Sequence, residues 1–402
     1  MAEVSNNTIR HESNVIVKEV VLFQGENGID ITQIFNGICI EEDIEKGFLR
    51  GTLLFIDDFL TSKDFLDGTE TIDITFSSID GNYAEVEVPY KKRFRVTKFE
   101  QTLQAGTGTN RSMVMHFVSP ASVINDTIKL FRSYTNTSSS AFVSHCCDLM
   151  HVDDKRFIEE TMHAKNFIAP NVSPLDMINW IKLTSQSKSN NGSDFYFFEN
   201  KDGVHFKSLE TMKTMEPTQT LVFKGAVDNY SYNTILKLSK PKGYDVQDDM
   251  RYGGAGATLY AHDLYTKECR RYTYNPELIT KLNPIDPRGK TYESSDSSYV
   301  QFWPHNNAYE TLDRNSNGHN SLIRSMAKTR INYKTMVVEL AGNIEIKSGD
   351  IINILVPGID GELQVSESGK WLVKKIRHMI TRSSYYMNLE VVTDGNIEYV
   401  HE

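Results

Sequence analysis

The chain has 402 residues, enough for roughly two to four domains with sizeable cores. With 39% hydrophobic and 24% charged residues it has the composition of an ordinary soluble protein; no apolar run approaches the roughly 18 residues of a membrane span, and the polar segment 1–13 has no signal-peptide core. The net charge of −10 is uneven, because residues 1–100 hold 19 acidic against 10 basic residues, so this part is unsuited to gripping nucleic acid.

The acidity admits two interpretations, and composition does not choose between them. An acidic surface suits the wall of a channel that DNA passes without sticking, and it equally suits a solubilising outer face. The four cysteines include an adjacent pair and have no metal-finger spacing, so synthesis in a reducing cytoplasm is favoured over a disulfide framework. They are Cys39, Cys146, Cys147 and Cys269.

Residues 15–118 are predicted to form a β unit. Short apolar segments alternate with polar residues, as in strands that bury one face. Ile72, Ile74 and Phe76, for example, fall on the same side of their strand. A small barrel or sandwich is therefore expected, with strands at 15–23, 52–55, 71–76, 84–88, 94–99 and 113–118.

The pattern changes at Ser119-Pro120, which favours a helix start because Ser caps helices well and Pro suits the first helical position. Further helices are expected over 140–150 and from Ser173-Pro174, and an Asp-Gly turn predicts a hairpin over 195–206. Residues 119–218 are therefore expected to be an α+β module. Its first helix is expected to carry Val123, Ile124, Ile128 and Phe131.

Strands return over 221–238, and a stretch of low regularity follows. Residues 240–320 contain a glycine-rich segment, several prolines and a Ser-rich run at 294–298. Such long irregular stretches are typical of binding loops or disorder. A helix is then expected near 322–331, before a second β unit with strands that begin near 336, 352, 371 and 387.

The two ends of the chain carry one pattern twice. The first copy places an aromatic, a valine and a lysine at alternate positions from Phe94, and the second does so from Trp371. Each copy continues into a partner strand, at 113–118 and 387–392. Each is predicted to be an antiparallel pair with one buried face. One such unit near each end can supply two equivalent building blocks to a ring, which indicates architecture rather than catalysis.

No catalytic, cofactor or metal site is predicted. Gly253-Gly254-Ala-Gly256 lacks the Gly-Lys-Ser/Thr of a phosphate-binding loop and is interpreted as a flexible loop. His145-Cys146-Cys147 with His151 fits no familiar zinc spacing, and Cys146 is expected to be a buried thiol on a helix. Motifs of serine hydrolases and zinc proteases are missing from the sequence.

Charged residues are interpreted as surface or interface groups. The acidic pairs 153–154 and 159–160 consist of neighbours, which point apart and form no general acid/base pair. His378 is expected to be a half-buried strand residue. A basic cluster is expected to face an acidic protein partner, including the N-terminal unit of a neighbouring copy, or nucleic acid. It comprises Arg324, Lys328, Arg330, Lys334, Lys370, Lys374, Lys375, Arg377 and Arg382.

Residues 15–395 resemble the central baseplate hub proteins of T-even-type contractile-tailed bacteriophages, in the order and length of their units. Local features carry this resemblance: Ala257–His262 followed by Asp263–Tyr265, and Leu236–Pro241 leading to Gly243–Asp245. The helix from Ser173-Pro174 with the following hairpin is also similar to the hub-like part of type VI secretion spike proteins. The polar loop 185–194 and the lack of a long C-terminal extension depart from the family pattern.

The resemblance implies a structural protein of the virion tail baseplate, without catalysis or cofactors, made and assembled in the host cytoplasm. It implies a homotrimer in which two similar tube domains per chain form a pseudo-six-fold ring between the hexameric tail tube and a trimeric spike. Expected partners are the other copies, the spike and the tube or tube-initiator proteins, with DNA only in transit and no membrane insertion. Spike repeats and a lysozyme-like segment do not occur in the sequence, so a separate partner is expected to supply them.

The expected fold class is α+β and β-rich, with two antiparallel β tube domains, an inserted α+β module and a loop-rich region. The resemblance further implies that the second tube domain is discontinuous. Because the first tube domain is acidic and the second lies near basic residues, contacts of first against second domain are expected between chains. The expected units are a polar tail 1–14, a tube domain 15–118, a module 119–218, joining strands 219–245, a loop-rich β region 246–320, a tube domain 321–395 and a tail 396–402.

Two other functions are retained as alternatives. A tail-associated peptidoglycan-degrading enzyme would need a cleft with a perturbed carboxylate or a metal, and the sequence shows neither. A receptor- or carbohydrate-binding tail protein would use the Tyr-rich loops from Tyr244 to Tyr309 as its binding surface. Solution mass and hydrolysis of purified peptidoglycan separate these functions from a structural hub.

Overall fold

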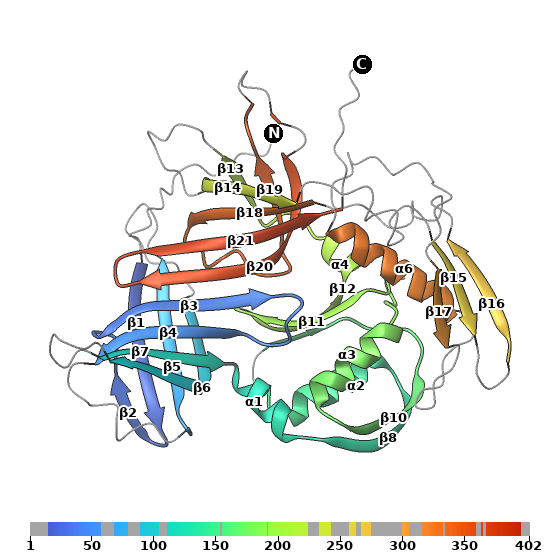
Figure 1. The fold of residues 1–402 in the computed structure, drawn as a ribbon, viewed down its shortest axis with the longest axis horizontal. Coiled ribbons are helices and arrows are strands. Elements are labelled where there is room, and N and C mark those ends of the chain that lie inside the picture. Colours follow the sequence, from blue (N-terminus) through green and yellow to red (C-terminus); the bar gives the residue numbers. More distant parts are fainter. Residues whose placement is uncertain are drawn as a thin grey trace.

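The computed structural model describes residues 15–57, 68–78, 89–103, 111–152, 155–190, 192–223, 233–242, 257–262, 267–274, 300–304, 316–332, 334–358, 363–364 and 367–394. Figure 1 shows two β regions beside a helical region. The first strands are β1 Val15–Gln24, β2 Asn27–Asp30, β3 Phe35–Asp43, β4 Arg50–Asp57, β5 Thr71–Ser78, β6 Tyr90–Leu103 and β7 Arg111–Val118. The last are β13 Gln219–Phe223, β14 Thr234–Lys242, β18 Lys334–Ala341, β19 Ile351–Leu355, β20 Gly369–Thr381 and β21 Tyr385–Thr393.

Thirteen of the described strands form one continuous sheet that runs from one end of the chain to the other. Its order is β19-β13-β14-β18-β21-β20-β3-β4-β7-β6-β5-β1-β2, and β19 also pairs with β20. The additional pairing closes β13, β14 and β18–β21 into a six-stranded barrel. The first β unit, β1–β7, continues from this barrel because β3 pairs with β20. The expected β-rich α+β fold class is therefore confirmed.

The two β units share their irregularities as well as their strands. In β6 the pairing with β7 shifts by one residue after Val96, and in β20 the pairing with β21 shifts after Val373. These valines lie two residues after Phe94 and Trp371, the aromatics of the predicted repeat. A β-bulge is a specific feature of a strand, so equal bulges at equal positions support one structural plan used twice.

A second bulge strengthens this equivalence. The pairing of β3 with β4 shifts after Phe35, and the pairing of β14 with β18 shifts after Ile235. The equivalent strands are therefore β3 and β14, β4 and β18, β5 and β19, β6 and β20, and β7 and β21. The units differ at β1 and β13, because β1 runs antiparallel to β5 whereas β13 runs parallel to β19.

Large apolar side chains fill both β units in a single core. Phe94 packs against Phe117 in the first unit, with tilted rings whose centroids are 4.7 Å apart, and Trp371 is almost fully buried in the second. Side chains from both units belong to one contiguous cluster. The alternation of apolar and polar residues that predicted the strands is the pattern that produces this core.

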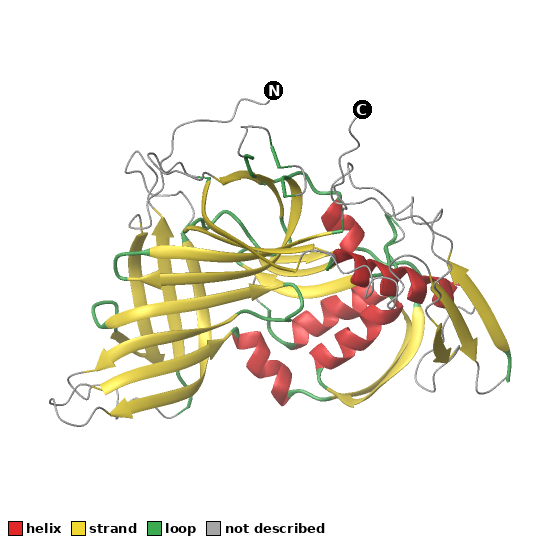
Figure 2. Cartoon of the chain, turned by 45° about the horizontal axis from the view of Figure 1, so that its top comes forward, coloured by secondary structure: helices red, strands yellow, loops and turns green. Residues whose placement is uncertain are grey.

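Residues 119–218 form the α+β module, and Figure 2 shows its helices gathered beside the large sheet. Ser173 caps α3, accepting a hydrogen bond from the Asp176 backbone N–H, as its sequence pattern predicted. Most elements of the module pack around a separate core, whereas Leu209 and Met212 of α4 belong to a third cluster. The elements of the module are α1 Pro120–Thr127, β8 Leu130–Thr137, α2 Ser139–Leu149, β9 Lys155–Ile158, β10 Lys165–Val172, α3 Pro174–Ile181, η1 Lys182–Thr184, β11 Phe195–Asn200, β12 Gly203–Ser208 and α4 Leu209–Lys213.

The first predicted helix is shorter than expected. It ends at Thr127, and Phe131 lies in β8 with 82% of its surface exposed. The helical spacing of Phe131 was therefore a coincidence, because Phe131 pairs with Pro170 of β10 in a two-stranded sheet. The strand expected at 84–88 lies outside the described residues.

The described residues between 257 and 331 add a small sheet and one helix. The sheet contains β15 Ala257–His262, β16 Cys269–Tyr274 and β17 Val300–Pro304, in the order β16-β15-β17. Helix α6, Ser316–Ile331, starts earlier than predicted and contacts β15 and β16. The Gly-rich segment 253–256, the Ser-rich run 294–298 and much of the Tyr-rich stretch lie outside the described residues.

Candidate assembly interface

The strand pair β3·β20 joins the two β units and is the most informative surface of the molecule. β3 lies antiparallel to the second half of β20, with Ile38 opposite Ile380 and Glu41 opposite Arg377 (Figure 1). Ile38 and Ile380 are almost fully buried. An edge strand exposes unpaired backbone groups that readily accept another strand. The first unit thus covers one edge of β20 with its own edge strand.

Opposite charges meet along this join. Glu41 accepts a hydrogen bond from the Arg377 guanidinium at 2.7 Å, and it lies 3.5 Å from the Lys375 ammonium and 3.1 Å from Arg50. Burial disfavours ionisation of Glu41, but these cations outweigh burial and lower the pKa of its carboxyl group. The acidic first unit and the basic second unit therefore attract one another within a single chain.

Glu42 connects three parts of the chain at the same place. Its side chain is 1% exposed and accepts hydrogen bonds from the backbone N–H of Lys201, at 3.2 Å, and of Ser348, at 3.0 Å. His378 Nε2 lies 3.5 Å from the same carboxylate, and its Nδ1 is 2.8 Å from the Tyr385 hydroxyl. This one carboxylate therefore ties the first β unit to the module and to the second β unit.

The basic cluster predicted to face a partner is largely used inside the chain. Lys374 lies 3.4 Å from Glu45, and Arg382 donates to the Phe35 carbonyl at 2.6 Å. Arg324 of α6 donates to the Leu183 carbonyl and fixes that helix on η1. These three contacts lie within one chain and involve one carboxylate and two backbone carbonyls, so the face for an external acidic partner stays a prediction.

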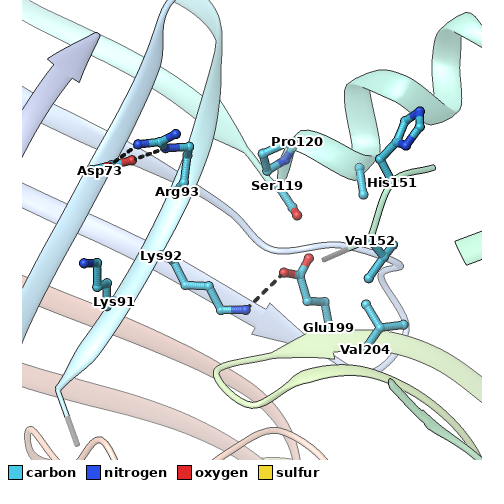
Figure 3. A pocket seen from close by; sticks show the side chains of 11 residues that line it. Asp73, Lys91, Lys92, Arg93, Ser119, Pro120, His151, Val152, Glu199 and Val204 are labelled. Carbon is cyan, nitrogen blue, oxygen red and sulfur yellow. Dashed lines mark hydrogen bonds and ion pairs between the residues drawn. The ribbon is translucent and has the colours of Figure 1, made fainter. Parts of the chain in front are cut away.

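A pocket of about 470 Å³ lies where β6 meets the module (Figure 3). Glu199 from β11 points toward Lys92 from β6, with Oε1 and Nζ 3.5 Å apart and both side chains buried. The other carboxylate that lines the pocket, Asp73, is held by Arg93 at 2.6 Å. Each carboxylate is thus held by a cation, which is the arrangement of structural ion pairs rather than of a general acid and base.

No group of three metal-binding side chains occurs among the described residues. The described helices also include none that is long and apolar enough to span a membrane. The neighbours Glu159 and Glu160 point apart as predicted: Glu159 accepts from Ser208 and Glu160 pairs with Lys188. His378, expected to be half-buried, is fully buried at 1% exposure. The Gly-rich loop 253–256 and the pair 153–154 fall outside the described residues.

Cys146 is buried as predicted, and so is its neighbour Cys147. Burial raises the pKa of the Cys147 thiol to about 11 and that of Cys146 further. We therefore expect a thiol reagent to modify the exposed Cys269 rapidly in the native protein and both helix cysteines only after unfolding. Ellman titration checks this, with Cys269→Ser as the control that removes the fast phase. Rapid modification of Cys146 without unfolding would contradict it.

Asp350, at the turn before β19, is expected to make the stability of the protein depend on pH. Burial raises the pKa of Asp350 from 3.8 to about 6, although it accepts a hydrogen bond from the Lys347 backbone N–H at 3.1 Å. Between these values the folded chain binds a proton that the unfolded chain has lost, so this group lowers the stability as the pH rises from about 4 to 6. Above pH 6 its penalty is constant.

Asp350→Asn is accordingly expected to stabilise the protein at pH 8 by about 1–3 kcal/mol, since an amide can still accept from Lys347 and no charge is buried. Its advantage should vanish near pH 4. Urea unfolding of the variant and the parent at several pH values measures the difference. Other titrating groups, such as the buried Asp194, occur in both proteins and cancel. A difference that does not change with pH would contradict the assignment.

Sequence reasoning missed β3, which carries the residues of the join. The signal was present, because Ile38 and Ile40 alternate with polar residues after Phe35. The run Glu41–Asp43 made this strand pattern hard to recognise, since three acids in succession suggest a loop. Two of the cations around Glu41, Lys375 and Arg377, lie more than 300 residues away along the chain, where local patterns do not reach.

The chain is similar to a protein of Vibrio phage KVP40 described as a "Probable baseplate hub protein". The two are 25% identical over 396 residues, which cover 92% of this chain and 91% of the relative. No family model matches the sequence. The resemblance to baseplate hub proteins that the sequence predicted is confirmed.

Solved structures of tail proteins share the fold. A tail protein from Neisseria meningitidis MC58 superposes with a TM-score of 0.59 at 10% identity, covering 93% of this chain and 96% of that one. The 43 kDa tail protein of prophage MuSo2 from Shewanella oneidensis gives 0.56 at 8% identity, covering 94% and 98%. A chain of the Francisella PdpA–VgrG complex gives 0.53 at 8% identity, covering 96% of this chain and 59% of that one. At such identities the likeness concerns the fold alone.

Proposed function

We propose that this chain, which resembles phage baseplate hub proteins, is a structural component at the centre of a tail baseplate. Three copies form a ring of six similar β units around a channel, and the ring adapts the six-fold tail tube to a three-fold spike. The ring-forming domains are residues 15–118 and residues 219–245 with 321–395. The module 119–218 and the loop-rich region 246–320 lie outside the ring.

The observation that carries this proposal is the duplicated β unit with its repeated bulges. A protein with a single function at one site has no need of two units of the same plan, whereas a ring of six positions built from three chains requires two per chain. The units are also joined edge to edge by β3 and β20, which is how successive members of such a ring would meet. The similarity to the KVP40 protein over nearly the whole length agrees with this role.

The proposal assigns the protein partners rather than substrates. Its partners are two further copies, a separate spike protein and the proteins of the tube, and DNA is a passing cargo. The acidity of residues 1–100 suits this passage, because phosphates are repelled from an acidic wall. The protein acts without catalysis and belongs to the virion tail, after synthesis and assembly in the host cytoplasm.

The mass of the purified protein in solution tests the proposal, alone and mixed with the spike protein of the same phage. A trimer in either sample is the expected result. Electron microscopy of the assembled particle should then show six similar β domains around a central hole. A chain that remains monomeric in both samples would overturn the proposal.

A further inference from the structure

The join between the two units of one chain serves as a template for contacts between chains. In it, β3 supplies one edge and the second half of β20 supplies the other, in antiparallel register. β14 takes the place of β3 in the second unit, and β6 takes the place of β20 in the first, as their bulges show. Each chain therefore carries a second, reciprocal set of the same two edges.

These reciprocal edges have no partner strand among the described residues. β14 pairs with β18 along its length, but on its other side β13 reaches only Thr234 and Ile235. β6 pairs with β5 only up to Arg95, so from Lys98 to Leu103 it pairs with β7 alone. Both segments thus present an edge of the kind that β3 and β20 use to pair.

Burial differs between the closed join and the open edges. Ile38 and Ile376, which lie at the join, are 2% and 0% exposed. The residues that take their places at the open edges are Leu238 of β14 and Phe99 of β6, and both are only partly buried. Two apolar side chains at equivalent positions therefore lack the cover that pairing gives to their counterparts.

Charged residues also favour the pairing of the β14 edge with the β6 edge, but the acid and the base exchange places. At the join, Glu41 of β3 lies opposite Arg377 of β20. In the second unit, the irregularity in β14 after Ser239 places Lys242 opposite Thr335 of β18. Glu41 lies opposite Arg50 at the same point of the first unit, so Lys242 takes the place of Glu41. Glu100 takes the place of Arg377, because it pairs with β7 as Arg377 pairs with β21. If β14 and β6 pair in the register of the join, the position of Lys242 lies opposite Glu100, whose side chain is 49% exposed.

We propose that the β14 edge of one copy pairs with the β6 edge of a second copy, in antiparallel register with Leu238 opposite Leu103 and Lys242 opposite Glu100. The inference rests on the proposed ring and names the strands that close it. Every contact in the ring is then of one kind, first unit against second, whether it lies within a chain or between chains. Main-chain hydrogen bonds hold the contact, and its register is the one transferred from the join of β3 with β20.

Disulfide trapping tests the register directly. Ser239 and Thr102 are opposite each other in the proposed pairing, as Cys39 and Met379 are in the join. Ser239→Cys with Thr102→Cys, in a Cys269→Ser background, is expected to give covalent dimers and trimers on mild oxidation, seen on a non-reducing gel. The matched control, Lys240→Cys with Thr102→Cys, places one thiol on the opposite face of the strand and should stay monomeric on the same gel.

Charge reversal tests the pairing without oxidation. Glu100→Lys is expected to weaken trimer formation at least tenfold in sedimentation experiments, and adding Lys242→Glu should restore it. Glu100 is exposed, so the single variant is expected to fold, which circular dichroism confirms. A parent trimer that gives no cross-link and tolerates Glu100→Lys overturns the edge pairing and leaves the ring standing. A parent protein that never forms a trimer overturns both.

Discussion

Replacing Glu42 with alanine is expected to destabilise the protein by about 3–5 kcal/mol, because it removes a buried carboxylate that accepts two backbone hydrogen bonds. The loss has three parts. The backbone N–H groups of Lys201 and Ser348 lose their acceptor, and His378 loses the carboxylate beside it. Ser348 and His378 are each 1% exposed, so they cannot reach water without local unfolding.

Urea unfolding measures this loss, and two further variants sharpen it. Glu45→Ala is the matched control, because Glu45 lies three residues away, is partly exposed and pairs with Lys374 at the surface. Its effect should remain below about 0.5–1 kcal/mol. Glu42→Gln keeps one acceptor oxygen and should fall between the two. Equal unfolding midpoints for Glu42→Ala and Glu45→Ala would refute the assigned role of Glu42.

Glu42→Ala is also expected to affect assembly, because Glu42 lies where the two β units meet. The carboxylate holds β3 to the turn at Ser348 and to the β11–β12 turn at Lys201, and so contributes to how the two β units are placed against each other. In a ring the same placement sets whether three chains close. Hydrogen exchange in Glu42→Ala should rise first at β3 and at the turn before β19, ahead of the barrel strands.

The repeat and most elements of the fold were predictable, because their signals are local. Alternation marked the strands from Phe94 and Trp371, and a capping serine with a following proline marked α3 at Ser173. The join was not predictable in this way. Its acids on β3 resemble a solvent-exposed run until Arg377 and Lys375 are placed beside them, which only the fold does.

The misjudged residues follow the same distinction between local and long-range signals. Phe131 fitted a helical spacing, but β8 pairs with β10 more than 30 residues later and takes it into a strand. His378 seemed half-buried because its strand neighbours are charged, yet Tyr90 and Tyr385 enclose its ring from both units. The basic cluster was recognised, but its contacts within the chain were not: Lys374 lies beside Glu45 and Arg377 beside Glu41 of the first unit.

Trp371→Ala is the second large effect expected, at about 3–5 kcal/mol, because it removes a fully buried aromatic from the core of the barrel. The indole also donates to the Glu367 carbonyl at 3.2 Å and so anchors the segment that leads into β20. Trp371→Phe keeps most of the volume and loses only this hydrogen bond, so it should cost about 1–2 kcal/mol.

Phe94→Ala tests whether the equivalent aromatic of the first unit contributes as much to stability as Trp371. Phe94 occupies the equivalent position in the first unit, is 0% exposed and packs on Phe117, so its loss should also cost about 3–5 kcal/mol. The location of the damage distinguishes the two variants. Hydrogen exchange should rise in β4–β7 for Phe94→Ala and in β18–β21 for Trp371→Ala.

The outcome bears on how the two units are connected. Their side chains belong to one contiguous core, and β20 is shared between the barrel and β3. If the units unfold independently, each variant loosens only its own strands, and the join is a docking contact between two folded bodies. If both variants loosen both units equally, the two units fold as one body, and the join of β3 with β20 forms together with the rest of the chain.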